Sequence, residues 1–226
     1  TAGLNALAFR RAGDVSGEPV NGALECIEKE PGEPPPGTLL EDDFDDLLDQ
    51  ECPPGMVCNS NNFTPRVVDG RLRITDDTVG STAATAIYEE TVNVCDFKMV
   101  AEFDLFLGNP DGTEAADGAA FFLREGSDTT ALGPGGGGLG LPVGGAGFAV
   151  EFDTWSNGTC CNEPSGFNTP DQFTHIGIQS SGIVSEINHV QYNPDLKPVA
   201  FGGTGWPNFF DPSGVNVQIE YDAGHI

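Results

Sequence analysis

Basic side chains are what this chain has least of. Nine Lys and Arg stand against 35 Asp and Glu in 226 residues, a formal net charge of −26, and Lys197 is the single basic residue after position 125. A polyanion of this kind repels phosphate backbones and anionic membrane surfaces, so we expect no nucleic-acid partner. The counter-ions expected for such a chain are metal cations or those of a salty medium.

Long apolar runs are also missing. A helix that spans a bilayer needs about 20 consecutive apolar residues, and no stretch of the sequence approaches that length. We therefore expect no membrane span.

The cysteines lack metal-site spacing. No CxxC pair occurs and the three histidines are scattered, which disfavours a structural zinc site. An even number of cysteines instead favours disulfides formed in an oxidising compartment. Cys52 and Cys58 are close enough to close a small loop, and the connectivity of the whole set stays open. The candidates are Cys26, Cys52, Cys58, Cys95, Cys160 and Cys161.

Two acceptor sequons agree with this compartment. Asn62 and Asn157 each stand two residues before a threonine, as N-glycosylation requires. Together with the disulfides, they predict an extracellular or cell-surface glycoprotein.

A persuasive helical period is missing as well, and strand patterns take its place. A Pro-rich stretch, 31–37, ends an extended N-terminal arm, residues 1–37, in which 2–9 is the one apolar segment that suits a strand. Residues 38–226 read as short strands separated by turns, with 31 Gly and 17 Pro. The expected fold is all-β, a two-sheet antiparallel jelly-roll sandwich. The expected strands are an Asp-Gly hairpin over 67–74, an alternating strand over 97–107, two compact central strands at 118–123 and 148–152, and further alternation at 176–178 and 215–221.

The stretch from Glu151 to Asn157 carries the clearest chemistry. Residues two apart in a strand point the same way, so Glu151 and Asp153 place two carboxylates on one face. Ca²⁺ takes six to eight oxygen ligands, and one imidazole among oxygens suits a transition ion such as Mn²⁺. Asn157, Asp171 and His175 follow as further donors. The competing interpretation is a set of acidic residues at a sandwich edge that binds no metal.

Four motifs in one order resemble the legume-type (L-type) lectins. They are Ala116-Asp-Gly-Ala-Ala-Phe-Phe-Leu123, Gly137-Gly-Leu-Gly-Leu141, Val150-Glu-Phe-Asp-Thr154 and His175-Ile-Gly-Ile178. The resemblance is firm over 116–178, extends over 39–221, and leaves out residues 1–37. It implies a calcium-dependent carbohydrate-binding fold.

The resemblance also implies a role for each matching position. Asp117 would accept hydrogen bonds from sugar hydroxyls, and Gly138 would offer a backbone N–H. Trp155 would ligate calcium through its carbonyl and present its ring to a sugar, unless it is simply a core aromatic. The implied metal ligands are Glu151, Asp153, Trp155, Asn157, Asp171 and His175, with His175 binding a transition ion such as Mn²⁺. Asn157 would contact both ion and sugar, or else carry a glycan.

Catalytic patterns are missing too. Related jelly-roll glycosidases use an E-x-D-x-x-E strand, and here Ser156 stands where the second glutamate would be. No GxSxG nucleophile elbow occurs. We therefore expect no enzyme.

Two functions remain. The first is an extracellular structural subunit that assembles head-to-tail into a fibre or surface layer. The domain of the resembled family continues for several strands beyond one like 215–221. The arm 1–37 would dock as a strand on a neighbouring subunit. In that reading calcium rigidifies a loop and glycans are attached. The alternative is a calcium-dependent carbohydrate-binding lectin module. The sequence favours the structural subunit slightly.

Overall fold

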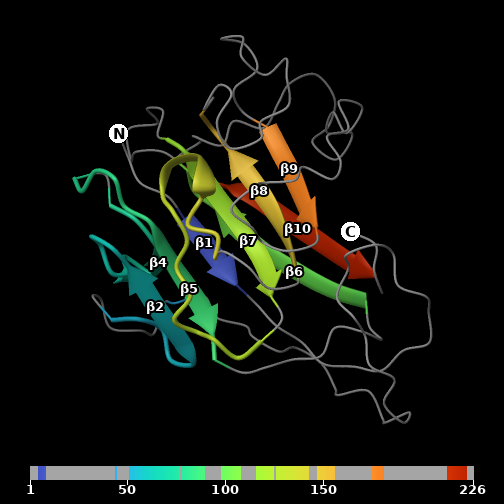
Figure 1. The fold of residues 1–226 in the computed structure, drawn as a ribbon, viewed down its shortest axis with the longest axis horizontal. Helices are drawn as coiled ribbons and strands as arrows, with labels where there is room; N and C mark the ends of the chain where they lie inside the picture. The colour runs from blue at the N-terminus through green and yellow to red at the C-terminus, as the bar shows by residue number, and fades with distance from the viewer. Residues whose placement is uncertain are drawn as a thin grey trace.

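The computed structural model describes residues 5–8, 44, 51–76, 78–89, 98–107, 116–124, 126–142, 147–155, 175–180 and 213–222. Within these ranges the chain forms ten strands and one three-residue 3₁₀ turn, so the predicted all-β class is confirmed (Figure 1). No helix in the described ranges is long and apolar enough to cross a membrane. The elements are β1 (Asn5–Ala8), β2 (Met56–Ser60), β3 (Arg66–Val68), β4 (Arg71–Arg73), β5 (Ala84–Tyr88), β6 (Lys98–Leu105), β7 (Gly118–Arg124), η1 (Gly136–Gly138), β8 (Gly147–Asp153), β9 (His175–Ser180) and β10 (Val215–Asp222).

The largest sheet has six strands in the order β2-β5-β1-β7-β8-β9. The pairs β2–β5, β7–β8 and β8–β9 are antiparallel. The compact runs predicted as central strands are β7 and β8, which lie in the interior of this order. Both strands are almost entirely buried because each has a covered face on either side.

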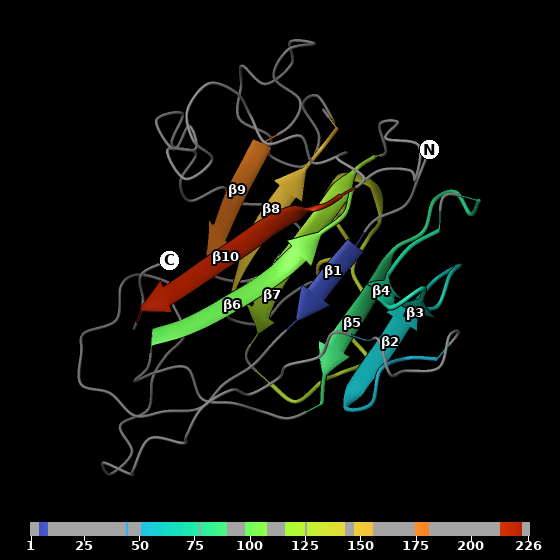
Figure 2. The ribbon, with the colours of Figure 1, turned by 180° about the vertical axis from the view of Figure 1, so that it is seen from behind.

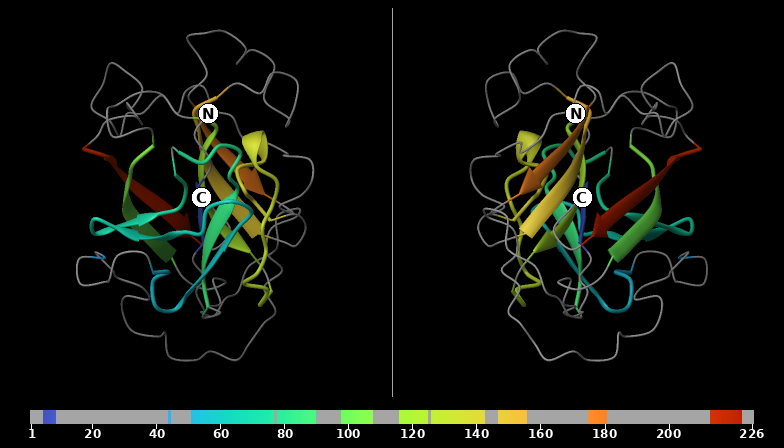
Figure 3. Two further views of the ribbon diagram at one scale, coloured as in Figure 1. Left: turned by 90° about the vertical axis from the view of Figure 1, so that its left-hand side faces the viewer. Right: turned by 90° about the vertical axis from the view of Figure 1, so that its right-hand side faces the viewer.

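The first face of the six-stranded sheet packs against β6 and β10. These two strands pair antiparallel and form a separate layer, seen edge-on in Figure 3. The apolar side chains of β6 alternate as predicted: Met99 is buried, whereas Val100 is exposed. The Phe103 ring of β6 stacks on Phe121 of β7 at a centroid distance of 6.2 Å and meets Phe152 of β8 edge-on at 6.3 Å. We call this the first core; its buried members are Met99, Leu107, Ala119, Phe121, Leu123, Phe148, Val150, Phe152, Val217 and Ile219.

The second face of the sheet is covered by the Gly-rich loop 131–141. Alternate residues of β7 and β8 point to it because successive strand side chains point to opposite faces. We call this the second core; it consists of Ile87, Ala120, Phe122, Leu139, Leu141 and Ala149, with Ala131 packed against it. The second core thus joins β5, β7 and β8 to that loop.

The predicted Asp-Gly hairpin is confirmed as β3 and β4. Asp69 and Gly70 connect the strands with φ values of 51° and 68°. Positive φ at both central residues is the requirement of a type I′ turn, which matches the twist of the flanking strands. Val67 is fully buried and anchors the hairpin.

Cys52 and Cys58 form a disulfide, which confirms the predicted small loop. The other candidate cysteines, at positions 26, 95, 160 and 161, lie outside the described residues.

The apolar segment of the N-terminal arm forms β1. This strand lies between β5 and β7 and runs parallel to both (Figure 2). Its Leu7 is the register partner of Ala86 on one side and of Phe121 on the other. Residues 9–37 of the arm lie outside the described ranges. Docking of the arm on a neighbouring subunit stays a prediction.

Candidate functional site

Strand register gathers three of the predicted site positions at one end of the large sheet. Asp153, the last residue of β8, pairs with Gly118 at the start of β7 and with His175 at the start of β9. Asp117 immediately precedes Gly118. The motifs that are far apart in the sequence therefore meet along one short row of the ladder.

The two carboxylates of β8 are buried. Glu151 is 1% exposed and Asp153 is 4% exposed, on the face that carries the second core. These two carboxylates are therefore shielded from solvent. Removing an ionised carboxylate from water is costly unless a cation or several hydrogen-bond donors compensate it. One such donor is the backbone N–H of Trp155, 2.7 Å from Oδ1 of Asp153.

Asp117 is tied to the end of β8 by its main chain. Its carbonyl oxygen accepts the backbone N–H of Thr154 at 2.7 Å and the Thr154 hydroxyl at 2.9 Å. The peptide bond between Ala116 and Asp117 is cis. The Asp117 side chain points toward the Gly-rich loop, with Oδ2 4.0 Å from the position that a Cβ on Gly136 would occupy.

The Gly-rich loop is an ordered turn with its own hydrogen bonds. The N–H of Gly133 donates to the carbonyl of Gly140 at 3.0 Å, and that of Gly140 donates to Pro134 at 2.9 Å. Leu139 is fully buried and fastens the loop to the second core. The loop is therefore held by its own hydrogen bonds and by one buried apolar side chain.

Within this loop, Gly136 faces Asp117, whereas Gly138 faces Pro134. A Cβ on Gly138 would lie 2.7 Å from Cγ of Pro134, so the loop needs a glycine there for its own packing. The Gly138 N–H donates to the carbonyl of Gly135 at 3.4 Å, a long hydrogen bond. The role predicted for its N–H toward a ligand stays a prediction.

Trp155 is half exposed, at 50%. Its ring is thus available to solvent beside Asp153 and Thr154, and its interpretation as a core aromatic is wrong. An exposed indole presents a flat apolar surface of the kind that stacks on a ligand ring.

Some predicted ligands fall outside the described residues. These are Asn157 and Asp171, and for His175 only the backbone position is described. Among the described residues no group of three or more His, Cys, Asp or Glu side chains is arranged to hold a metal ion. The calcium and Mn²⁺ assignments stay predictions. Of the two sequons, Asn62 is exposed, as glycosylation requires, and its side-chain amide donates to the carbonyl of Ser81 at 3.1 Å.

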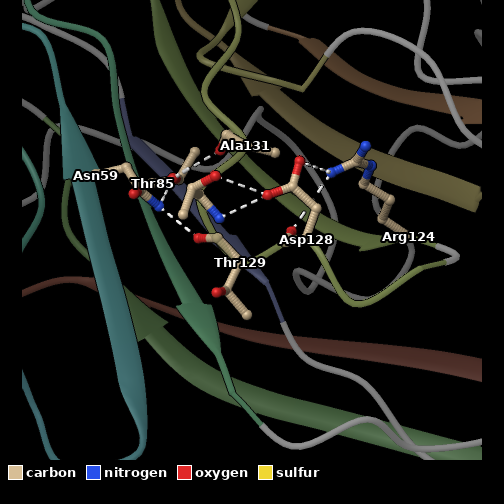
Figure 4. A network of polar contacts seen from close by, with 7 residues as sticks. Asn59, Thr85, Arg124, Asp128, Thr129 and Ala131 are labelled. Carbon is tan, nitrogen blue, oxygen red and sulfur yellow. Dashed lines mark hydrogen bonds and ion pairs between the residues drawn. The ribbon is translucent and has the colours of Figure 1, made fainter.

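Sequence reasoning missed three kinds of residue at this site. Thr154 ends the Val150–Thr154 motif, but no sequence pattern indicated that it would bond to Asp117. Gly136 belongs to a run of four glycines whose members the sequence cannot distinguish. Asn59 and Thr85 come from distant strands, and they contact the segment that leads into the Gly-rich loop (Figure 4).

At the outer end of that segment, Asp128 is held by its neighbours. Its Oδ1 accepts the Thr130 hydroxyl at 2.7 Å and the Thr130 N–H at 2.9 Å, and its Oδ2 lies 3.6 Å from Nη1 of Arg124. The hydrogen bonds from Thr130, and next to them the Arg124 charge, hold the pKa of Asp128 below its ordinary value of 3.8.

Comparison with known proteins adds no relatives: the chain matches no protein-family model and no curated protein sequence.

Proposed function

We propose that this chain is an extracellular, calcium-dependent carbohydrate-binding module with an L-type-lectin-like jelly-roll sandwich. The observation that carries the proposal is the placement of the Asp117 carboxylate beside Gly136, next to the β8 end that holds Asp153. A carboxylate acceptor beside exposed loop backbone is an arrangement suited to paired sugar hydroxyls. The order of the four sequence motifs supports the same reading.

Calcium would act on the turn that follows β8. Glu151 and Asp153 would supply carboxylates, Trp155 its carbonyl, and Asn157 and Asp171 the remaining oxygens, with His175 reserved for a transition ion. Calcium held there would offset the charge of the two buried acids. Sugar binding would then depend on calcium, because Trp155 and Asn157 would serve both the ion and the sugar.

The charge of the chain selects the class of sugar. At −26, the protein repels sulfated and uronic-acid polymers over a Debye length. The expected ligand is therefore a neutral saccharide, with hydroxyls for Asp117 and an apolar ring face for Trp155.

Calcium titration calorimetry and a neutral-glycan array, each run in Ca²⁺ and in EDTA, test the proposal. We expect Ca²⁺ binding in the wild-type chain that Asp153→Asn weakens at least about tenfold, since the buried carboxylate becomes a neutral amide. Trp155→Ala should keep Ca²⁺ affinity and lose glycan retention. Asp104→Asn, an exposed acid of β6 in the other layer, is the matched control. A wild-type chain that binds no Ca²⁺ at millimolar concentration contradicts the proposal.

A second function is favoured by β1. This four-residue strand is paired on both sides in the interior of the large sheet, where it separates β5 from β7. The same slot would accept β1 from a neighbouring subunit, which is head-to-tail strand donation. In that case the lectin-like sandwich serves as a scaffold for a fibre or surface layer, and glycans are attached at Asn62 or Asn157.

Negative-stain microscopy of native material tests this second function. Leu7→Pro removes a backbone N–H from β1 and should shorten or abolish fibres, whereas Leu7→Ile should preserve them. Discrete monomers in the native sample would eliminate strand donation and leave the carbohydrate-binding proposal intact.

A further inference from the structure

Two side chains from β2 and β5, at the edge of the large sheet opposite β9, hold the segment that leads into the Gly-rich loop. Asn59 of β2 and Thr85 of β5 are register partners. The Asn59 Nδ2 donates to the carbonyl of Thr129 at 2.7 Å and to the Thr85 hydroxyl at 3.2 Å. The Thr85 hydroxyl in turn donates to the carbonyl of Ala131 at 3.2 Å, so one hydroxyl both accepts and donates (Figure 4).

The residue that links these bonds, Thr85, is buried, whereas Asn59, Thr129 and Ala131 are half-buried. Thr85 is 0% exposed, and Ala131 packs against the second core. A hydrogen bond lost in such a place leaves a buried polar group unsatisfied, which costs more than a hydrogen bond lost at the surface. The segment 129–131 is therefore fixed to β2 and β5 by polar contacts across 70 and 46 residues of sequence.

The loop rises directly from this fixed segment. Gly133 closes the stem through its bond to Gly140, and a Cβ on Gly133 would lie 1.6 Å from the carbonyl oxygen of Leu141. The two sides of the stem are thus in direct contact, and only glycine fits at position 133. We therefore expect a displacement at Ala131 to shift Gly136, and with it the space in front of Asp117.

We propose that Asn59 and Thr85 are positioning residues for the ligand-binding loop. They fix the position of Gly136 relative to the Asp117 carboxylate and do not contact the ligand themselves. This inference rests on the proposed carbohydrate-binding function. It competes with a simpler account in which the apolar contacts of Leu139 and Leu141 alone place the loop.

The sharpest variant is Thr85→Val. Valine keeps the branched shape and the strand preference of threonine, and it removes the hydroxyl that joins Asn59 to Ala131. Asn59→Ala removes the other half of the contact. Thr85→Ser restores a hydroxyl and is the rescue variant. Asn216→Ala, which loses one side-chain bond to Asp104 in the β6–β10 layer, is the control.

Two measurements separate this inference from the proposed function. Hydrogen exchange reports the loop itself: in Thr85→Val and Asn59→Ala, the amides of Leu139 and Gly140 should exchange about tenfold faster, while the β6–β10 amides keep their rates. Glycan affinity, measured with the array saccharide that the wild-type chain retains best in Ca²⁺, should fall about tenfold in both variants with Ca²⁺ affinity unchanged. Thr85→Ser should recover both.

Each alternative result has a distinct meaning. Unchanged loop exchange in Thr85→Val and Asn59→Ala overturns the positioning role and assigns the loop to its apolar contacts. Faster exchange with unchanged glycan affinity overturns the link between loop and ligand. Absence of any glycan binding by the wild-type chain rejects the proposed function, and with it the ligand role of the loop, whatever the exchange rates show.

Discussion

Thr154 donates both its backbone N–H and its hydroxyl to a single acceptor, the carbonyl oxygen of Asp117, at 2.7 and 2.9 Å. The residue after β8 is thereby locked to the residue before β7. These two bonds fix the Asp117 backbone, and so help to place its carboxylate next to the Gly-rich loop. Both bonds lie at the end of β8 that carries the buried acid Asp153.

Thr154→Val tests the locking. The variant keeps the N–H bond and loses the hydroxyl bond in a buried position, so we expect unfolding to become easier by about 1 kcal/mol. Glycan affinity should fall as Asp117 gains freedom, and Ca²⁺ affinity should hold. Urea denaturation and the glycan assay measure the two effects, and Thr154→Ser should behave as wild type. Equal loss in the serine variant would mean that the methyl group, not the hydroxyl, matters.

Gly136→Ala tests whether the space in front of Asp117 is used. The φ of Gly136 is +66°, so alanine there costs about 1 kcal/mol in backbone strain, and its Cβ would stand 4.0 Å from Oδ2 of Asp117. We expect glycan affinity to drop at least about tenfold. Gly126→Ala is the control: its φ is +106° and its Cβ would meet nothing within 4 Å. Equal loss of binding in both variants would point to strain rather than blocked space.

The Asp128 carboxyl offers a test of the segment that carries the loop. Its folded pKa lies below the ordinary 3.8, so its contribution to stability is present above that value and is lost as pH falls through the folded pKa. Thr130→Val removes the side-chain hydrogen bond that is the largest cause of the shift. An NMR titration of the carboxyl carbon should therefore show the Asp128 pKa rising toward 3.8 in the variant. An unmoved pKa would assign the shift to the backbone N–H and Arg124.

The disulfide tests the independence of the two ends of the large sheet. Replacing Cys52 and Cys58 by serine opens a short loop at β2, which by chain entropy costs about 2 kcal/mol. Calcium and glycan affinities should stay unchanged, because the site lies at β7, β8 and β9. Thermal unfolding and calorimetry check both expectations. Loss of calcium binding in the folded variant would show that the ends are coupled.

Much of the fold could be predicted because its signals are local. Asp69-Gly70 demands positive φ at both positions, which specifies the hairpin turn. The alternation from Met99 to Leu107 predicted which side of β6 is buried. The opposite case is β1. Nothing in a four-residue apolar segment says that it pairs in parallel between β5 and β7, since pairing partners are chosen by long-range packing.

The site, too, has features that the sequence could predict and features that it could not. The spacing of Glu151 and Asp153 predicted a shared face, and that pair lies buried on one face of β8. The pattern could not say that Trp155 is exposed, because exposure depends on what the rest of the chain brings over a ring. It also could not choose Gly136 among four glycines, since the choice depends on where Asp117 points.

By itself, the sequence determined most of the strands (but not β2 or β5), the tight turn, the short disulfide loop and the side of β8 that carries two acids, because periodicity, turn chemistry and short loop closure act within a few residues. Only the tertiary structure decided that Asp117 lies beside Gly136, that Thr154 locks Asp117, and that Asn59 and Thr85 hold the loop's base. Those contacts join residues that are 19 to 70 positions apart in the sequence, and they form because packing on the covered face of one sheet brings distant polar groups within hydrogen-bonding reach.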